Sequence, residues 1–187
     1  MWPFPRKTPR ELDPELLARL RPFVAPPGVL PRGIAKDAPE IFPGVVVAVA
    51  VHDETRVDFV LRPSAGQRQT AVENLRRLPL PPVQTFRTED FEVSLFEAQD
   101  DFVAARVTFL DQLAEAAAPG RPRRDGVLVA IPRRRTVLLH VLGRGDPDRA
   151  RDALVLAAGN LFNETPHSKL SPRVYYVEPD GRAQVVA

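Results

Sequence analysis

The chain has 187 residues, with 26 Lys and Arg against 24 Asp and Glu, which gives a formal net charge of +2. A hydrophobic content of 44% and a charged content of 27% are ordinary for a globular protein and argue against disorder or a fibrous protein. The small charge excess provides only a weak general attraction to nucleic acid. Because the chain has no cysteine, disulfide bonds, thiolate nucleophiles and cysteine-based metal sites are excluded.

The length favours one domain. The first seven residues, Met1 to Lys7, lack the continuous apolar segment of a secretory signal. No later apolar run approaches the ~20 residues of a membrane-spanning helix. We therefore expect a cytoplasmic protein that has no membrane association.

Residues 1–43 are predicted to form an N-terminal arm. Asp13 can cap a short helix that has Pro14 at its first position and ends near Pro22. The stretch 25–43 is rich in Pro and Gly and is predicted to be a connection. Residues 44–187 are then expected to form a single domain.

From residue 44 onward the pattern repeats two strands followed by a helix, and it ends in a hairpin. The predicted strands are, in chain order, 45–51, 57–61, 83–87, 91–96, 127–131, 137–142, 173–177 and 183–186. Helices are predicted to begin at Ser64, at Asp100 or Asp101, and at Asp146, and to end before Pro79, at Pro119 and near Asn163. Since sheets and helices both need another layer to cover their apolar faces, this order predicts an α+β fold. We expect helices packed on a mixed or largely antiparallel sheet, and the sequence leaves the strand order open.

Several segments in the later part of the chain resemble one known family. They are Ala71-Val72-Glu73-Asn74-Leu75, Gly126-Val127-Leu128-Val129-Ala130-Ile131-Pro132, Val137-Leu138-Leu139-His140-Val141, Leu170-Ser171-Pro172-Arg173-Val174-Tyr175-Tyr176-Val177 and Asp180-Gly181. From about Gln67 to Gln184, their order and spacing resemble the YtpQ-like bacterial proteins, a family of unknown function. The resemblance implies a compact cytoplasmic bacterial domain, and it carries no substrate or catalytic residue.

Two arginine clusters flank the strand predicted at 127–131. Arg121, Arg123 and Arg124 precede it, and Arg133, Arg134 and Arg135 follow it in a turn. Guanidinium groups can hold phosphates or carboxylates with two parallel hydrogen bonds. The clusters lie at opposite ends of the strand, ~17 Å apart at ~3.3 Å per residue, so we expect two separate solvated rims rather than one pocket.

The segment 163–169 is the densest group of chemically reactive side chains. It includes His167, Ser168 and Lys169. Neighbouring side chains on an extended loop point apart, and no nucleophile motif surrounds Ser168, so catalysis is disfavoured. An ordinary connection is the simplest interpretation, and a loop that contacts a ligand or partner is the alternative.

The three histidines, His52, His140 and His167, have no metal-binding spacing. His140 alternates with apolar residues in a strand, which favours a hydrogen-bonded structural histidine. We expect no metal site, no cofactor and no catalytic residue.

Three functions stay open. The composition favours a non-enzymatic binding or adaptor protein, for instance a bacterial accessory or immunity protein, whose protein partner is unknown. One alternative is a small-ligand binder or enzyme in which His140, His167 and distant carboxylates converge. Another is weak phosphate or nucleic-acid binding by the arginines. The binding candidates are Arg123, Arg124, Arg133, Arg134, Arg135, His167 and Lys169. A homodimer formed through the strands near 174–177 and 185–186 is also open.

Overall fold

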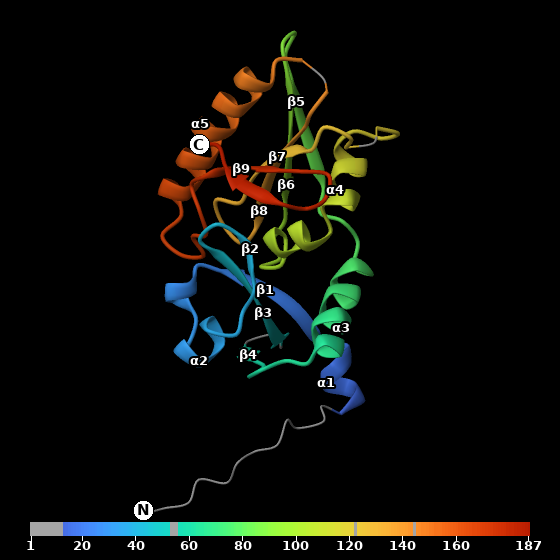
Figure 1. Ribbon diagram of the computed structural model, residues 1–187, viewed down its shortest axis with the longest axis vertical. Helices are drawn as coiled ribbons and strands as arrows, with labels where there is room; N and C mark the ends of the chain where they lie inside the picture. Colours follow the sequence, from blue (N-terminus) through green and yellow to red (C-terminus); the bar gives the residue numbers. More distant parts are fainter. Residues whose placement is uncertain (1–12, 53–55, 122, 144) are drawn as a thin grey trace, which may run out of the picture.

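Two antiparallel sheets organise the chain (Figure 1). The computed structural model describes residues 13–52, 56–121, 123–143 and 145–187. Every strand pair within these residues is antiparallel, and helices cover the sheets. The predicted α+β class is therefore confirmed.

The first sheet has four strands: β1 (Leu20–Ala25), β2 (Glu40–Phe42), β3 (Val45–His52) and β4 (Val57–Phe59). β3 lies in the centre, because β1, β2 and β4 all pair with it. Its run of small and β-branched residues suits a strand that is covered on both faces.

The beginning of the chain differs from the prediction. Helix α1 (Pro14–Ala18) is capped by the Asp13 side chain as expected, but it ends four residues before Pro22, and Pro22 lies inside β1. A proline is tolerated there because β1 is an edge strand. The predicted connection contains η1 (Pro27–Val29), α2 (Arg32–Ala35) and β2.

Helix α3 (Ala65–Arg76) covers part of one face of this sheet. Ser64 and Gln67 form the reciprocal capping box that starts it. Ala71 of the helix packs with Leu20 of β1 and Val49 of β3.

The second sheet has six strands in the order β10-β9-β7-β8-β6-β5. They are β5 (Val83–Arg87), β6 (Glu92–Glu97), β7 (Val127–Ala130), β8 (Thr136–Val141), β9 (Val174–Val177) and β10 (Ala183–Val185). β9 lies between β7 and β10, so it is not an edge strand, and the homodimer considered through 174–177 cannot use it as one.

Both faces of the six-stranded sheet are buried at its central strands β7 and β8. Helix α5 (Pro147–Glu164), which Asp146 caps, places Leu154 and Ala158 against one face. The other face shares a core with η2 (Ala104–Phe109), α4 (Leu110–Ala117) and the four-stranded sheet. One apolar core therefore joins the two sheets.

The long helix predicted from Asp100 or Asp101 to Pro119 is wrong in its first half. Residues 104–109 form the 3-10 helix η2, and Phe109 interrupts the helix with φ −142° and ψ 60° before α4 begins. Arg106 is only 2% exposed and donates to the carbonyls of Leu78 and Pro79, at 3.4 and 2.7 Å. Burial lowers the pKa of Arg106, and the nearby Asp100 carboxylate partly offsets this. Packing between the sheets has overridden the helical pattern here.

Within the described residues, no helix is both long and apolar enough to cross a membrane.

Candidate functional site: the Arg cleft

The turn between β7 and β8 lies beside the loop that follows α5. The amide of Arg134 donates to the carbonyl of Ser168 at 3.1 Å, and the amide of Leu170 donates to the carbonyl of Pro132 at 3.0 Å. Arg133 and Lys169 form an isolated antiparallel bridge. Main-chain hydrogen bonds thus bring together the arginine turn and the loop at 163–169, two segments that the sequence singled out separately.

These segments enclose a polar cleft with a volume of about 490 Å³. We call it the Arg cleft. Its lining residues are Glu97, Ala98, Gln99, Asp101, Arg133, Arg134, Arg135, Thr165, Pro166, His167 and Ser168. Four predicted binding residues, Arg133, Arg134, Arg135 and His167, therefore share one site.

Arg133 is a structural clamp. Its Nε donates to Thr136 Oγ1 at 2.8 Å, its Nη1 donates to Thr165 Oγ1 at 3.1 Å, and its Nη2 pairs with the Glu97 carboxylate. These contacts connect the end of β6, the start of β8 and the end of α5. Because all three guanidinium nitrogens have partners, Arg133 builds the wall of the cleft.

Arg135 is also paired, at the outer rim. Its Nε lies 2.7 Å from Asp101 Oδ1, and its Nη1 donates to Gln99 Oε1 at 3.1 Å. The side chain is 44% exposed, so water competes for these contacts. Asp101 nevertheless largely compensates the charge of Arg135.

Arg134 differs from both neighbours. Its nearest carboxylate oxygen, Asp101 Oδ2, is 3.8 Å from Nη2, which is too far for a hydrogen bond. Its Nε is buried and has no hydrogen-bond partner among the described residues. The guanidinium instead lies over the ring of Phe23 in β1, with Cζ 5.1 Å from the ring centroid. Arg134 therefore keeps hydrogen-bond donors that the described residues leave unused.

The cleft carries one positive charge beyond its internal pairs. Glu97 compensates Arg133 and Asp101 compensates Arg135, whereas Arg134 shares Asp101 only at longer range. A guanidinium held against an aromatic ring is a suitable receptor for a carboxylate or phosphate.

The opposite wall has an unusual backbone conformation. Ser168 has φ +64°, a left-handed conformation that is uncommon for residues other than Gly, Asn and Asp. The hydrogen bond from Arg134 to its carbonyl holds it there. Such strain is often found at binding sites. His167 beside it is exposed, so the wall offers an imidazole and a hydroxyl to a ligand.

The other three predicted binding residues lie outside the Arg cleft. Lys169 directs its Nζ to the ring of Phe162, 4.7 Å from the centroid. Arg123 pairs with Asp111 at 2.7 Å on α4, and Arg124 is exposed just before β7. The two arginine clusters are thus separate, as the strand length predicts.

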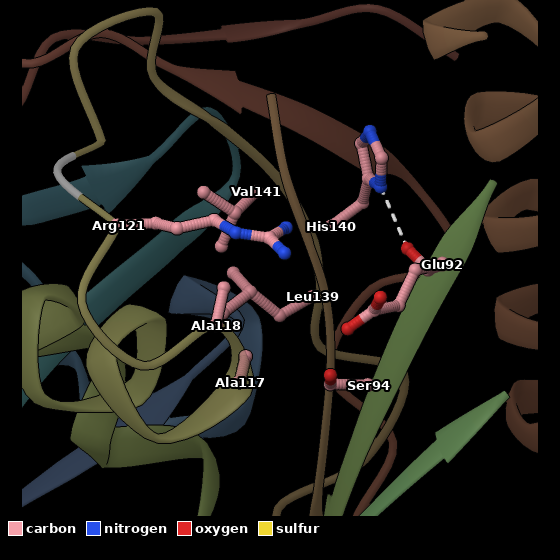
Figure 2. Close-up of a pocket in the computed structure, with 8 residues that line it drawn as sticks. All are labelled: Glu92, Ser94, Ala117, Ala118, Arg121, Leu139, His140 and Val141. Carbon is pink, nitrogen blue, oxygen red and sulfur yellow. Dashed lines mark hydrogen bonds between the residues drawn. The ribbon is translucent and has the colours of Figure 1, made fainter. Parts of the chain in front are cut away.

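His140 and His167 do not converge. His140 is 2% exposed, and its Nδ1 lies 2.6 Å from the carbonyl oxygen of Glu92. Figure 2 shows its ring beside Glu92, with Arg121 approaching from the other side of the strand. The cavity drawn there has a volume of only about 10 Å³, too small for a ligand. The geometry gives no support to an enzyme site built from His140 and His167.

Across the described segments, no group of three His, Asp or Glu side chains is placed to hold a metal ion.

Tyr175 is a titratable residue whose side chain is buried in the core. Burial raises its pKa above 10.0, although its hydrogen bond with Ser171 acts in the opposite direction.

The acidic stretch from Glu89 to Asp101 is typical of a solvated face, and sequence reasoning did not connect its carboxylates with the arginine turn. Glu97 is the last residue of β6, and Gln99 and Asp101 follow it. Their signal was the acidic stretch at the end of a strand that pairs with the arginine-bearing hairpin, and using it required the β6–β8 pairing.

Comparisons with known proteins do not add to this picture: no family model matches the chain, and no curated protein or solved structure is similar to it. The resemblance to YtpQ-like proteins stays a prediction.

Proposed function

We propose that this chain is a non-enzymatic binding protein that receives an anionic group of a protein partner, a carboxylate or a phosphate, in the Arg cleft. The observation that carries the proposal is Arg134: a partly buried guanidinium that lines a polar cleft, lies on Phe23, and has no carboxylate within hydrogen-bond distance. Charge-assisted hydrogen bonds to such a group are stronger than those between neutral groups.

The arrangement favours binding over catalysis. Arg133 and Arg135 are already occupied by Glu97 and Asp101, so they shape the cleft and leave one cation for a ligand. His167 and Ser168 are adjacent in the chain, and the structure gives no hydrogen bond between their side chains that would activate the hydroxyl.

A free small anion is the second candidate. A volume of about 490 Å³ lies within the range of small-molecule sites. Both candidates use the same chemistry at Arg134, so an experiment must distinguish the source of the anion. Extended nucleic-acid binding has less support, because no Phe, Tyr or Trp is among the described residues that line the cleft and the two arginine clusters are separate.

Affinity purification from the native cell tests the proposal. The bait is the tagged full chain, compared with Arg134→Met and with the control Arg182→Met, which removes an ion-paired arginine from the β9–β10 turn. Half of each sample is treated with nuclease. We expect one specific protein with the unaltered chain and with the control, with or without nuclease, and its loss with Arg134→Met.

Other outcomes have defined meanings. Recovery of the same protein by Arg134→Met contradicts the use of the Arg cleft. Recovery only of nucleic acid favours the nucleic-acid alternative. If no macromolecule is recovered but the purified chain binds inorganic phosphate or acetate in a way that depends on Arg134, the small-anion candidate is supported.

A further inference from the structure

The outer edge of β5 is an open strand edge. Residues 83–87 pair with β6 in a continuous register, and all five are exposed, with Val83 at 39% and Phe86 at 55%. No strand within the described chain pairs with the other side of β5.

The hairpin geometry fixes which main-chain groups point outward. The amide of Thr88 donates to the carbonyl of Phe91 at 2.9 Å, so this pair is hydrogen-bonded. Because hydrogen-bonded and non-hydrogen-bonded pairs alternate, Val83, Thr85 and Arg87 direct their N–H and C=O groups away from β6. The 3.4 Å approach of the Thr85 and Ser94 hydroxyls agrees with a non-hydrogen-bonded pair, where side chains lie closer. β5 therefore presents a row of unused donors and acceptors that suits another strand.

The other edges are protected in ways that β5 is not. β1 contains Pro22, β2 has an irregular register between Glu40 and Phe42, and β4 has three residues. β10 has three residues and lies against β2. Short strands, prolines and irregularities prevent edge-to-edge pairing. Residues 83–87 contain no Pro or Lys and no break in register.

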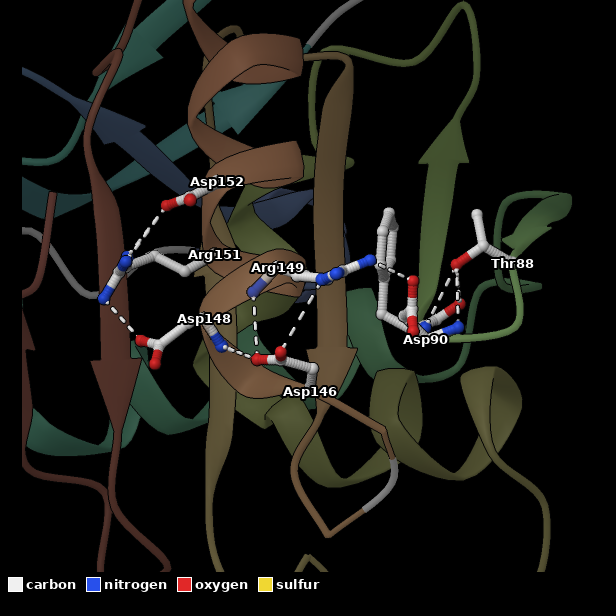
Figure 3. A network of polar contacts seen from close by, with 8 residues as sticks. Thr88, Asp90, Asp146, Asp148, Arg149, Arg151 and Asp152 are labelled. Atoms are coloured by element: carbon white, nitrogen blue, oxygen red, sulfur yellow. Dashed lines mark hydrogen bonds and ion pairs between the residues drawn. The ribbon is translucent and has the colours of Figure 1, made fainter.

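The β5–β6 hairpin is also held in place (Figure 3). Asp90 in its turn forms an ion pair with Arg149 of α5, and its carbonyl accepts a hydrogen bond from the amide of Asp146 at 2.7 Å. The Thr88 hydroxyl accepts from the amides of Asp90 and Phe91. The contacts of Asp90 hold the turn against α5, so the position of β5 is fixed before another strand pairs with it.

Charge and symmetry indicate the occupant. Arg87 is the one charged residue of β5, and it pairs with Glu92 of its own hairpin at 2.8 Å, so the edge does not select a charged strand. When Thr85 lies on a two-fold axis, Arg87 lies opposite Val83 of the partner strand. An axis at Arg87 would oppose like charges, and an axis at Val83 would place Pro81, which has no N–H, opposite Thr85 in the paired region.

We propose that β5 pairs with β5 of a second copy of this chain, with Thr85 near the two-fold axis, so that the two six-stranded sheets become continuous. Phe86 and the exposed Leu156 on α5 supply apolar area beside the strands. Leu156 lies two helical turns from Arg149, on the flank of α5 that faces the hairpin. A contact of five residues per strand is small, so the dimer dissociates on dilution.

Sedimentation velocity of the full chain over a range of concentrations tests the dimer. The variant Phe86→Lys places a charge on the edge at an exposed position, and the control Val185→Lys makes the same change on β10, where the residue is 40% exposed. We expect the unaltered chain and Val185→Lys to dimerise with rising concentration and Phe86→Lys to stay monomeric, with the same far-ultraviolet circular dichroism for all three.

A second measurement uses the absence of cysteine from the chain. Facing Cα atoms in a hydrogen-bonded antiparallel pair are ~5.5 Å apart, within the range of a disulfide. Mild oxidation should therefore link Thr85→Cys into a covalent dimer and leave Val185→Cys monomeric. A chain that stays monomeric at every concentration, or that loses its dimer through Val185→Lys but not through Phe86→Lys, overturns the proposal.

Discussion

Arg134 lies over the ring of Phe23, with 5.1 Å between the guanidinium Cζ and the ring centroid. The contact joins the turn between β7 and β8 to strand β1 of the other sheet. It orients the guanidinium without neutralising its charge, which an acidic partner would do. The site thus depends on how the two sheets pack together.

A double-mutant cycle measures this contact. We expect Phe23→Leu and Arg134→Met to be coupled by about 0.5–2 kcal/mol in the free energy of unfolding, obtained from urea denaturation. Phe23→Leu and Arg182→Met, which do not touch, should be additive. Equal coupling in both cycles would show that Phe23 does not support Arg134.

The three arginines of the turn should differ in their structural importance. Arg133→Met should lower the free energy of unfolding by about 1–3 kcal/mol, because it removes three hydrogen-bonding contacts from a side chain that is 22% exposed. Arg135→Met removes a more exposed pair and should cost about 0–1 kcal/mol. Equal losses in chemical denaturation would refute the assignment of Arg133 as the clamp.

Stability should fall at alkaline pH through Tyr175. Its hydroxyl donates to the carbonyl of Pro43 at 3.3 Å and shares a hydrogen bond with Ser171 at 2.6 Å. Burial raises the pKa of Tyr175 in the folded state, so its contribution is present below the unfolded pKa of about 10 and is lost as the pH rises above it.

Tyr175→Phe should therefore cost about 1–2 kcal/mol near neutral pH, where a buried hydrogen bond is lost, and should reduce the decline in stability above about pH 10. The control Tyr176→Phe, which removes a hydroxyl bonded to the Asp125 carbonyl, should keep that decline. Urea unfolding at a series of pH values measures both. An unchanged alkaline decline in Tyr175→Phe would contradict the account.

Alanine substitutions at two glycines distinguish the cost of a steric clash from the cost of a positive φ in the free energy of unfolding. Both Gly126 and Gly120 have positive φ, at +87° and +71°. A Cβ at Gly126 would lie 2.5 Å from the carbonyl oxygen of Val177 and 2.6 Å from the Tyr176 ring, whereas nothing lies within 4 Å at Gly120. Gly126→Ala should therefore destabilise by about 1–3 kcal/mol more than Gly120→Ala in thermal or urea unfolding. Equal effects would mean that the close approach to β9 relaxes without cost.

Local sequence signals predicted the strands of the second sheet and the helices α3 and α5. Ser64 and Asp146 cap α3 and α5 as expected, and two apolar runs predicted β7 and β8. β1 was missed because Pro22 resembles a helix end, and only its position at a sheet edge makes a proline acceptable in the strand. The 3-10 helix at 104–109 reflects the burial of Arg106 between elements, which local periodicity does not encode.

The site was predictable in part. The arginine turn and the loop at 163–169 stood out through their side-chain chemistry, but their contact depends on main-chain hydrogen bonds between residues more than 30 positions apart in the chain, such as Arg134 and Ser168. The acidic partners Glu97 and Asp101 could not be assigned before β6 was known to pair with β8. The distinction between Arg133, Arg134 and Arg135 needed the individual contacts.

The most direct measurement of the central claim is a titration of the isotope-labelled full chain with inorganic phosphate and, separately, acetate, followed by two-dimensional ¹H–¹⁵N NMR. We predict saturable shifts concentrated at Arg133 to Arg135 and at Thr165 to Ser168, which disappear in Arg134→Met and persist in Arg182→Met. Non-saturating shifts spread over the exposed arginines, or saturable shifts that survive Arg134→Met, would contradict an anion site in the Arg cleft.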